Sequence, residues 1–506
     1  MLGQVISSAT LGMDAYTVNV EVHAGRGQPF LRIVGLPDGV VRESEERVLS
    51  ALASTGYSCL SKRTIINLAP ADKRKDSAAL DLPIAIGLMQ AYGLVPTLRT
   101  KTHGMIGELG LDGSIKPVTG ALVVASHLKD AGFEGLLTPT KNVAEAAAVN
   151  GLEARGFNHL SEVVAWLRSE TKVEPAPPTP IRGRLAHWED VDLGDVCGQQ
   201  HAKRALEIAA AGAHNILLIG PPGSGKTMLA RRVPTLLPPM NTLEIMETSK
   251  LYSVAGKLNG HGLLVERPFC NPHHVASDVG LIGGGASPRP GQVSLAHNGV
   301  LFLDELPEFK RRALEMLRQP LEDGEVVISR AAYTARFPAR FILVAAMNSC
   351  PCGFLGDLTH KCTCSPQAVV RYRQRISGPL LDRIDLHVEV PAVPYREMRA
   401  GGGENSEVVR TRVEAARRLA AERLAGTSAQ TNGDMTSRLT WQFAEPDADG
   451  HRLLETLHDK LGLSARGLMR VLKVARTIAD LDGAPHVRSA HIAEAVQYRT
   501  LDRLVS

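Results

Sequence analysis

Short apolar runs separated by helical stretches mark the middle of this chain. The runs are residues 216–219, 300–303 and 341–345. A continuous apolar run of this length is typical of a strand that is buried on both faces, as strands are in parallel sheets. Strands that alternate with helices predict an α/β fold built on a parallel sheet.

The residues before this region show a different mixture of patterns. The expected strands are residues 18–22, 65–68 and 135–138, and the expected helices are residues 44–54 and 118–131. Together they predict an α+β domain over residues 1–168. A linker is expected at residues 169–183, because the proline-rich stretch at 174–180 is typical of a semi-rigid spacer.

The α/β domain is expected over residues 184–400, where a glycine run closes it. Residues 401–506 have helical periodicity and predict an all-α domain. Its expected helices are residues 406–424, 451–460, 465–481 and 489–497, with a polar interruption at 427–435.

Length, composition and charge limit the class of protein to which these domains can belong. The 506 residues suffice for about three domains. No apolar run reaches the ~18 residues of a membrane span, and the first residues lack the features of a signal peptide, so we expect a cytoplasmic protein without a membrane partner. The net charge of +4 permits nucleic-acid binding but argues for it only weakly. Seven cysteines in such a protein do not indicate a disulfide framework.

A glycine-rich motif follows the first apolar run. It consists of Gly220, Pro221, Pro222, Gly223, Ser224, Gly225, Lys226 and Thr227, and it fits G-x-x-x-x-G-K-[ST] between a strand and a helix. The glycines let backbone N–H groups turn inward around phosphates. We expect Lys226 to reach the β- and γ-phosphates of ATP, and Thr227 to bind Mg²⁺.

Two carboxylates end the second apolar run. Asp304 is expected to hold the Mg²⁺ shell, and Glu305 to polarise the attacking water. The glycine-rich motif and this acidic strand together predict an enzyme that hydrolyses ATP. Asn348 ends the third run and could orient the water, although an asparagine after a strand is more often a turn residue.

An arginine further along the chain could act on a neighbouring subunit. An arginine at a subunit edge stabilises the charge that develops on the γ-phosphate, an effect of about 10³–10⁵ in rate. Arg383 is the candidate, and Arg375 is the second choice. The alternative is that Arg383 only pairs with Asp382 or Asp385 on the surface.

Residues 280–308, GLIGGGASPRPGQVSLAHNGVLFLDELPE, resemble the AAA+ core of magnesium-chelatase-like proteins. With NLAPADKRK at 67–75 and DLPI at 81–84, the whole chain resembles the YifB/ComM branch of that family. The resemblance implies a Lon-protease-like α+β amino-terminal domain, an AAA+ P-loop core and an all-α lid at the carboxyl end.

The same resemblance implies a homohexameric ring with ATP bound between subunits. It matches Asn348 to the water-orienting position, Arg383 to the trans-acting arginine finger and Arg466 to the sensor-2 arginine of the lid. Arg466 stands at a helix start, where a basic side chain is not favoured by the helix dipole. This mismatch favours a functional role for Arg466.

Two inserts of this branch are expected to face the pore of the ring. They are a helix-2 insert at residues 267–289 and a hairpin at residues 325–334. Arg289, Arg330 and Arg336 are therefore candidate contacts to DNA phosphates, which would be independent of base sequence. The alternative is a flexible glycine loop with solvated arginines.

Two Cys-x-Cys pairs lie close together after the third apolar run. Cys350 and Cys352 form the first pair, and Cys362 and Cys364 form the second. Four thiolates on two short arms suit a structural, tetrahedral Zn²⁺, although the spacing differs from the common C-x₂₋₄-C arms. Free buried thiols or an iron–sulfur site are the alternatives, and His360 could replace one cysteine.

The resemblance of the first domain to Lon protease does not extend to its catalytic dyad. The nucleophile would fall at Ala79 or Leu80, with Ser77 out of register, and the lysine would fall near Leu122. We therefore expect a scaffold or DNA-binding domain and no peptidase.

Three functions are compatible with these motifs. The first is an ATP-driven helicase acting on single-stranded and branched DNA, which promotes branch migration in natural transformation, with recombination proteins as candidate partners. The second is a chelatase-type or MoxR-like ATPase that remodels a protein partner. The third is a DNA-binding ATPase switch that does not unwind.

Overall fold

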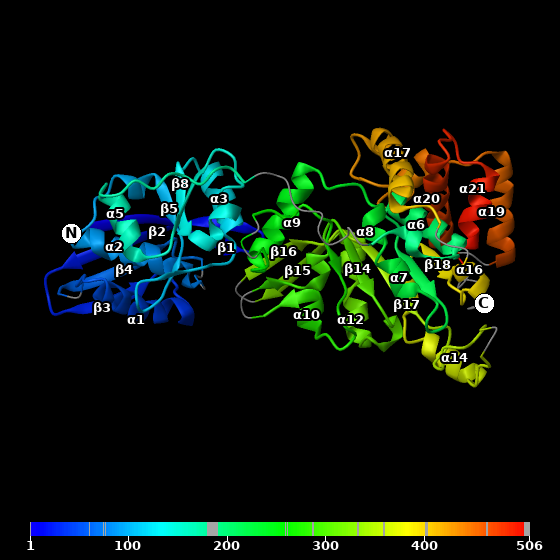
Figure 1. The fold of residues 1–506 in the computed structure, drawn as a ribbon, viewed down its shortest axis with the longest axis horizontal. Helices are drawn as coiled ribbons and strands as arrows, with labels where there is room; N and C mark the ends of the chain where they lie inside the picture. Colours follow the sequence, from blue (N-terminus) through cyan, green and yellow to red (C-terminus); the bar gives the residue numbers. More distant parts are fainter. Residues whose placement is uncertain are drawn as a thin grey trace.

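The computed structural model describes residues 2–59, 61–73, 75, 77–179, 191–258, 260, 262–285, 288–330, 333–357, 360–399, 403–461 and 464–499. Figure 1 shows an elongated chain with the elements of the first 167 residues at one end. A parallel sheet with its helices forms the middle, and the carboxyl-terminal helices lie at the other end. The observed mixture of a parallel sheet and helices confirms a mixed α/β architecture.

The amino-terminal region contains two larger sheets. One has the order β1-β2-β4-β3 and the other has the order β5-β8-β9. The strands are β1 Leu2–Leu11, β2 Asp14–Gly25, β3 Phe30–Val34, β4 Arg63–Ala69, β5 His103–Met105, β8 Gly135–Pro139 and β9 Glu153–Phe157, with a short β6 Glu108–Leu109 and β7 Ile115–Lys116 pair. The helices are α1 Gly39–Ser54, α2 Asp81–Ala91, α3 Ala121–Asp130, α4 Val143–Ala146 and α5 Leu160–Leu167. Every residue of α2 is buried, because the helix packs between α1 and strands β1 and β2.

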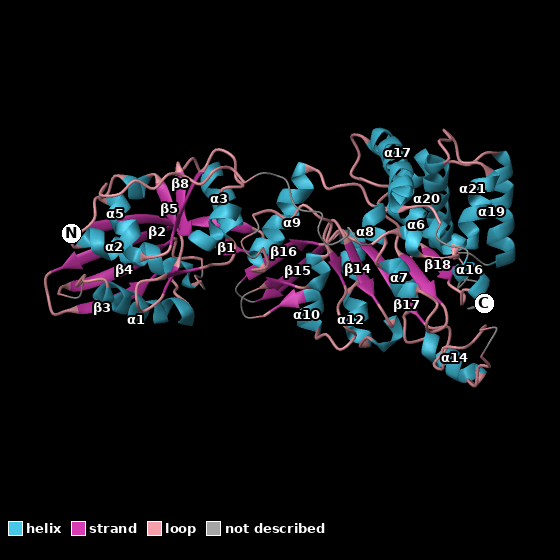
Figure 2. Cartoon of the chain, in the orientation of Figure 1, coloured by secondary structure: helices cyan, strands magenta, loops and turns pink. Residues whose placement is uncertain are grey.

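The central sheet has five parallel strands in the order β11-β14-β17-β10-β18. These are β10 Ile216–Ile219, β11 Phe269–Cys270, β14 Val300–Leu303, β17 Ile342–Met347 and β18 Leu386–Glu389. Figure 2 labels β14, β17 and β18 of this sheet, with helices around them. Alternate residues of β10 enter two different cores: Ile216 and Leu218 pack with α6, α17 and α20, whereas Leu217 and Ile219 pack on the face that holds α10 and α12. Burial of both faces explains the continuous apolar runs in the sequence.

The helices of the central region are mostly short. They are α6 Gln200–Gly212, α7 Lys226–Ala230, α8 Val233–Leu236, α9 Thr242–Val254, α10 Asp278–Ile282, α11 Gln292–Leu295, α12 Arg311–Met316, α13 Arg318–Asp323, α14 Pro366–Arg373, α15 Gly378–Leu381 and α16 Tyr395–Arg399. This region also contains two antiparallel pairs: β12 Gly283–Gly284 with β13 Arg289–Pro290, and β15 Glu325–Arg330 with β16 Tyr333–Pro338. The hairpin expected near residues 325–334 is therefore present.

The carboxyl-terminal region is helical, as the periodicity predicts. Its helices are α17 Ser406–Leu424, α18 Ser437–Phe443, α19 Ala448–Leu461, α20 Ala465–Leu481 and α21 Ser489–Gln497. Helices α17 and α20 pack against α6, so this bundle shares one core with the sheet.

Two details differ from the sequence pattern. Strand β11 lies inside the segment that was expected to be wholly an insert, because two residues flanked by prolines carry no periodic signal. Part of the proline-rich segment is attached to the first domain: the backbone N–H of Ala176 donates to Ala154 O at 2.8 Å, and that of Thr179 donates to Ala147 O at 3.2 Å. Residues 180–190 lie outside the described part of the chain.

Candidate nucleotide-binding site

Three groups of predicted site residues meet at one edge of the central sheet. Strands β10, β14 and β17 are parallel, so their carboxyl ends lie at the same edge. The glycine-rich loop follows β10, Asp304 and Glu305 follow β14, and Asn348 follows β17. The strand order brings these segments together although they are far apart in the chain.

The glycine-rich loop needs its glycines for two different reasons. A Cβ atom at Gly220 would overlap the carbonyl oxygen of Val390, so only glycine lets the loop start so close to the chain after β18. Gly225 has a φ of +91°, in the left-handed region, at the point where the chain enters α7. The hydroxyl of Ser224 is buried and has no hydrogen-bond partner among the described residues, so the loop keeps a polar group available for a ligand.

Lys226 is folded back onto the loop. Its Nζ donates to the carbonyl oxygens of Gly220 and Pro221, both at 2.8 Å, and to Oδ1 of Asn348 at 3.3 Å. Burial lowers the pKa of this ammonium group, and the nearby carboxylate of Asp304 opposes that shift. The contact with Asn348 places the predicted water-orienting residue beside the predicted phosphate-binding lysine.

The predicted magnesium ligands touch each other. The Thr227 hydroxyl donates to Oδ2 of Asp304 at 2.7 Å, and the other carboxylate oxygen accepts the backbone N–H of Glu305 at 2.9 Å. A hydroxyl beside a carboxylate is an oxygen donor set that suits Mg²⁺. The residues therefore fit both the nucleotide and the ion that the motif predicts.

Glu305 has an unusual backbone conformation and an unexpected partner. Its φ of 52° lies in the left-handed region, which is costly for a residue other than glycine and is enriched at functional sites. His274 Nδ1 lies 3.3 Å from Oε2 of Glu305. His274 lies inside the segment 267–289 that the sequence predicts to be an insert, and no catalytic role was expected for it. No local pattern could have revealed this contact, because His274 reaches Glu305 through the pairing of β11 with β14, and β11 carries no periodic signal.

Arg383 and Arg466 lie elsewhere. Both line a cavity of about 600 Å³ together with Asn215, Gly299 and Ile342, which stand at the amino ends of β10, β14 and β17. The cavity is therefore at the opposite edge of the sheet from the glycine-rich loop. Within one chain, the structure does not bring these two arginines to the nucleotide site.

The partners of Arg383 differ from Asp382 and Asp385, the two carboxylates that the sequence suggested. Its guanidinium donates to Pro379 O and to the carboxylate of Glu322, and its side chain is only 10% exposed. Asp385 is instead engaged by His214 at 3.2 Å and by Arg470 at 3.1 Å.

Arg375, the second candidate for the arginine that acts on a neighbouring subunit, lies at the edge of the sheet that holds the nucleotide loop. It binds both carboxylate oxygens of Glu308, at 2.8 and 2.9 Å, three residues after Glu305.

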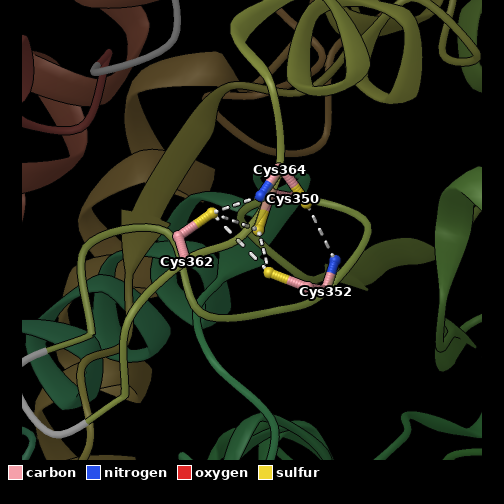
Figure 3. Close-up of side chains that lie close together, drawn as sticks. All are labelled: Cys350, Cys352, Cys362 and Cys364. Carbon is pink, nitrogen blue, oxygen red and sulfur yellow. Dashed lines mark hydrogen bonds between the residues drawn. The ribbon is translucent and has the colours of Figure 1, made fainter.

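The four cysteines converge directly after Asn348. Their sulfur atoms all lie within 4.8 Å of one another, and Figure 3 shows the side chains facing a common centre. The sulfur–sulfur distances are 3.3 Å for Cys350–Cys352, 3.7 Å for Cys350–Cys362 and 3.6 Å for Cys352–Cys362. A tetrahedral Zn²⁺ with bonds of about 2.3 Å needs sulfurs about 3.8 Å apart, so the set fits such an ion. His360 is no member of this group, because its ring lies beside Asp357 and Phe354.

Comparisons with known proteins match nearly the whole chain. Family models described as "Magnesium chelatase, subunit ChlI", "Subunit ChlI of Mg-chelatase" and "Magnesium chelatase, subunit ChlI C-terminal" match residues 192–398, 20–142 and 403–499. Competence protein ComM of Haemophilus influenzae is 44% identical over 510 residues, covering 100% of this chain and 98% of ComM. YifB of Escherichia coli is 42% identical over 507 residues, covering 100% of this chain and 98% of YifB. The chain belongs to the ComM/YifB family of magnesium-chelatase-like AAA+ proteins.

Membership in the ComM/YifB family implies ATPase activity, in agreement with the geometry of the site. A shorter similarity links 30% of this chain to 51% of the magnesium-chelatase 38 kDa subunit of Cereibacter sphaeroides, at 27% identity. Among the described residues, no helix combines the length and the apolar character that a membrane span requires.

The candidate DNA-binding arginines lie on neighbouring hairpins. A Cβ atom at Gly283 of β12 would lie 3.1 Å from the side chain of Ile328 in β15, so the two antiparallel pairs are adjacent. Arg289 and Arg336 are both exposed, and Arg336 pairs across its hairpin with Glu325. Strand β15 ends at Arg330, whose side chain lies outside the described part of the structure.

The positions of the Lon-type dyad contain no reactive pair. Ala79, Leu80 and Leu122 are buried, and the Ser77 hydroxyl caps a short 3₁₀ helix by accepting the N–H of Ala79 at 3.2 Å. Lon protease 2 of Bacillus subtilis is 29% identical over 149 residues, which are 28% of this chain and 27% of that protease.

Proposed function

We propose that this ComM/YifB-family ATPase is a hexameric DNA motor in the cytoplasm. It would act as a helicase on single-stranded and branched DNA, promoting branch migration of recombination intermediates such as those formed when transforming DNA is integrated. Full-length similarity to a competence protein supports this role. Recombination proteins are the partners that such a role would require.

One observation carries the proposal. The nucleotide loop and the acidic strand lie at one edge of the sheet, whereas Arg383 and Arg466 line a cavity at the other edge. Two such edges on one chain form a complete site when one subunit packs head to tail on the next, and head-to-tail packing closes into a ring. Arg383 would then stabilise the γ-phosphate of the neighbouring subunit's ATP, with Arg466 beside it.

The residues at the loop edge have separable tasks. Lys226 and the backbone of the loop would bind the phosphates, Thr227 and Asp304 would hold Mg²⁺, and Glu305 would accept a proton from water that Asn348 orients. When bound, Mg²⁺ supplies charge neutralisation between the β- and γ-phosphates.

The DNA contacts are proposed on the two adjacent hairpins. Arg289 and Arg336 are exposed there, and Arg330 is the last residue of β15. Exposed arginines on adjacent hairpins suit phosphate contacts that carry no base specificity. The amino-terminal region is proposed to be a Lon-like scaffold without peptidase activity, because the dyad positions carry Ala79 or Leu80 and Leu122.

A structural Zn²⁺ is proposed at Cys350, Cys352, Cys362 and Cys364, since the sulfur positions fit a tetrahedral ion.

The deciding experiment follows a labelled four-way or three-strand junction with ATP, using the wild type and Lys226→Ala side by side. Movement of the junction by the wild type alone supports the motor. ATP hydrolysis that DNA stimulates without strand movement would favour a switch. Hydrolysis indifferent to DNA would favour the second candidate, a chelatase-type or MoxR-like ATPase that remodels a protein, which the similarity to the 38 kDa chelatase subunit favours.

A further inference from the structure

We propose that metal occupancy of the four-cysteine cluster controls nucleotide affinity, because the cluster holds a loop against the glycine-rich motif. The proposal rests on the nucleotide site described above and adds a regulatory role to a metal otherwise expected to be structural. Three links carry it: one is made by the cluster segment, residues 350–364, and the other two are made by the residues directly before and after that segment.

The first link is along the strand. Cys350 stands two residues after Asn348, and Oδ1 of Asn348 accepts a hydrogen bond from Nζ of Lys226 at 3.3 Å. Cys350 itself is fully buried. An ion that fixes the Cys350 sulfur therefore fixes the backbone that presents Asn348 to the lysine.

The second link is a direct contact with the glycine-rich motif. Gly353 has a φ of +89°, and a Cβ atom there would lie 2.7 Å from Cδ and 2.8 Å from Cγ of Pro222. The turn after Cys352 therefore packs closely against the proline ring of the loop that would cradle the phosphates. Contact this close passes a displacement of the turn directly to the loop.

The third link comes from the segment that follows the cluster. Helix α14 starts one residue after Ser365, which caps it, and ends with the buried Tyr372 and with Arg373, whose guanidinium donates to Ser349 O at 3.5 Å. Arg375 then binds Glu308 beside the acidic strand. The chain on either side of the cluster segment thus contacts the edge of the sheet that holds the nucleotide loop.

The cysteines are arranged to hold an ion rather than to fill a core. Backbone N–H groups point at two of the sulfurs: that of Cys352 donates to Cys364 at 3.4 Å, and that of Cys364 donates to Cys362 at 3.4 Å. Such donors stabilise thiolates in a site that otherwise exposes three of its four cysteines to solvent in part. Without an ion, no bond ties the two Cys-x-Cys arms together, so the turn at Gly353 loses the closure that an ion would supply.

The coupling must work in both directions. If the metal raises nucleotide affinity by some factor, then nucleotide raises metal affinity by the same factor. This reciprocity gives a readout that does not depend on catalysis.

The test measures zinc content by atomic emission and the binding of fluorescent ADP to zinc-loaded and chelator-treated full-length protein. We expect one zinc per chain, ADP binding at least tenfold weaker after zinc removal, and slower zinc release to a colorimetric chelator when ADP is present. Cys362→Ser, on the arm far from Asn348, should lose zinc and ADP affinity together. Cys197→Ser, which lies outside the cluster, is the matched control.

Gly353→Ala separates coupling from folding. The added methyl group would collide with Pro222, and all four cysteines are retained, so this variant should keep its zinc and bind ADP more weakly. Equal ADP affinity with and without zinc would overturn the coupling alone, and a protein that binds no zinc would overturn both the coupling and the proposed zinc site. A zinc-loaded wild type that binds no ADP would instead overturn the proposed nucleotide site.

Discussion

His274 lies against Glu305, with Nδ1 of the ring 3.3 Å from Oε2 of the carboxylate. The two residues follow β11 and β14, which are neighbours at one end of the central sheet. Glu305 is the residue proposed to accept a proton from water, and its carboxylate has the ring of His274 as a partner. The pair is partly exposed, with side-chain exposures of 32% and 56%, so its contribution is modest.

Removing this partner should raise the basal rate of ATP hydrolysis. In His274→Ala the carboxylate of Glu305 is no longer held, and we expect an increase of about two- to fivefold, the factor that ~0.5–1 kcal/mol corresponds to. Phosphate release without DNA measures it. His274→Asn keeps a donor and should stay near the wild-type rate. A lower rate in His274→Ala would mean that the histidine assists Glu305 instead of restraining it.

Substitutions at Lys226 and Glu305 should separate binding from hydrolysis. Lys226→Ala removes the ammonium group that lies at the loop and should abolish ATP binding. Glu305→Gln keeps the shape of the site but cannot accept a proton, so it should bind ATP and hydrolyse it about 10²–10⁴-fold more slowly. Equilibrium binding and single-turnover hydrolysis of labelled ATP check both variants. Hydrolysis at the wild-type rate by Glu305→Gln would remove that residue from its assigned role.

Mixed rings test whether Arg383 acts on a neighbour. Arg383→Ala and Lys226→Ala should each be inactive alone, the former by about 10³-fold or more. In an equal mixture, an intact loop meets an intact arginine at about a quarter of the head-to-tail interfaces. We therefore expect about a quarter of the wild-type ATPase activity. If the mixture stays as inactive as its components, Arg383 does not complete a neighbouring site.

Stability should depend on pH through His387, which lies on β18. Burial lowers its pKa from 6.5 to about 3, and Arg499 and Arg470 add to the shift while Asp385 opposes it. Below pH 6.5 the unfolded chain binds a proton here that the folded chain does not bind. The stabilisation is thus complete above pH 6.5 and is lost as the pH falls toward 3.

Between pH 6.5 and 5 this loss amounts to about 2 kcal/mol, since each unit is worth about 1.36 kcal/mol. Urea unfolding followed by tryptophan fluorescence at pH 7, 6 and 5 measures it. His387→Leu does not titrate at this position, so its stability should fall less over the same range. Identical pH dependence in the two proteins would show that other groups govern acid unfolding.

Much of the fold follows from local patterns that the structure reproduces. The periodic stretch at 465–481 became α20 with the same ends, and the run at 300–303 became β14. Long periodic segments and fully buried strands carry their own signal, because one face or both faces must be covered. Strand β11 escaped prediction since two residues between prolines show no period at all.

The sequence by itself determined the chemistry of the nucleotide edge. The glycine-rich loop, Asp304 and Thr227 are recognisable because phosphate and Mg²⁺ binding require particular residue types at fixed local spacing. The sequence predicts a metal site from the two Cys-x-Cys arms for the same reason, since a metal ion needs its ligands close together along short arms.

Only the tertiary structure decided which distant residues meet. The order of strands in the sheet put His274 beside Glu305 and placed the cavity of Arg383 and Arg466 at the edge away from the loop. The tertiary structure also brought Gly353 against Pro222. Such neighbours depend on how strands pair and cross over, and periodicity records only whether a residue is buried, not which distant segment buries it.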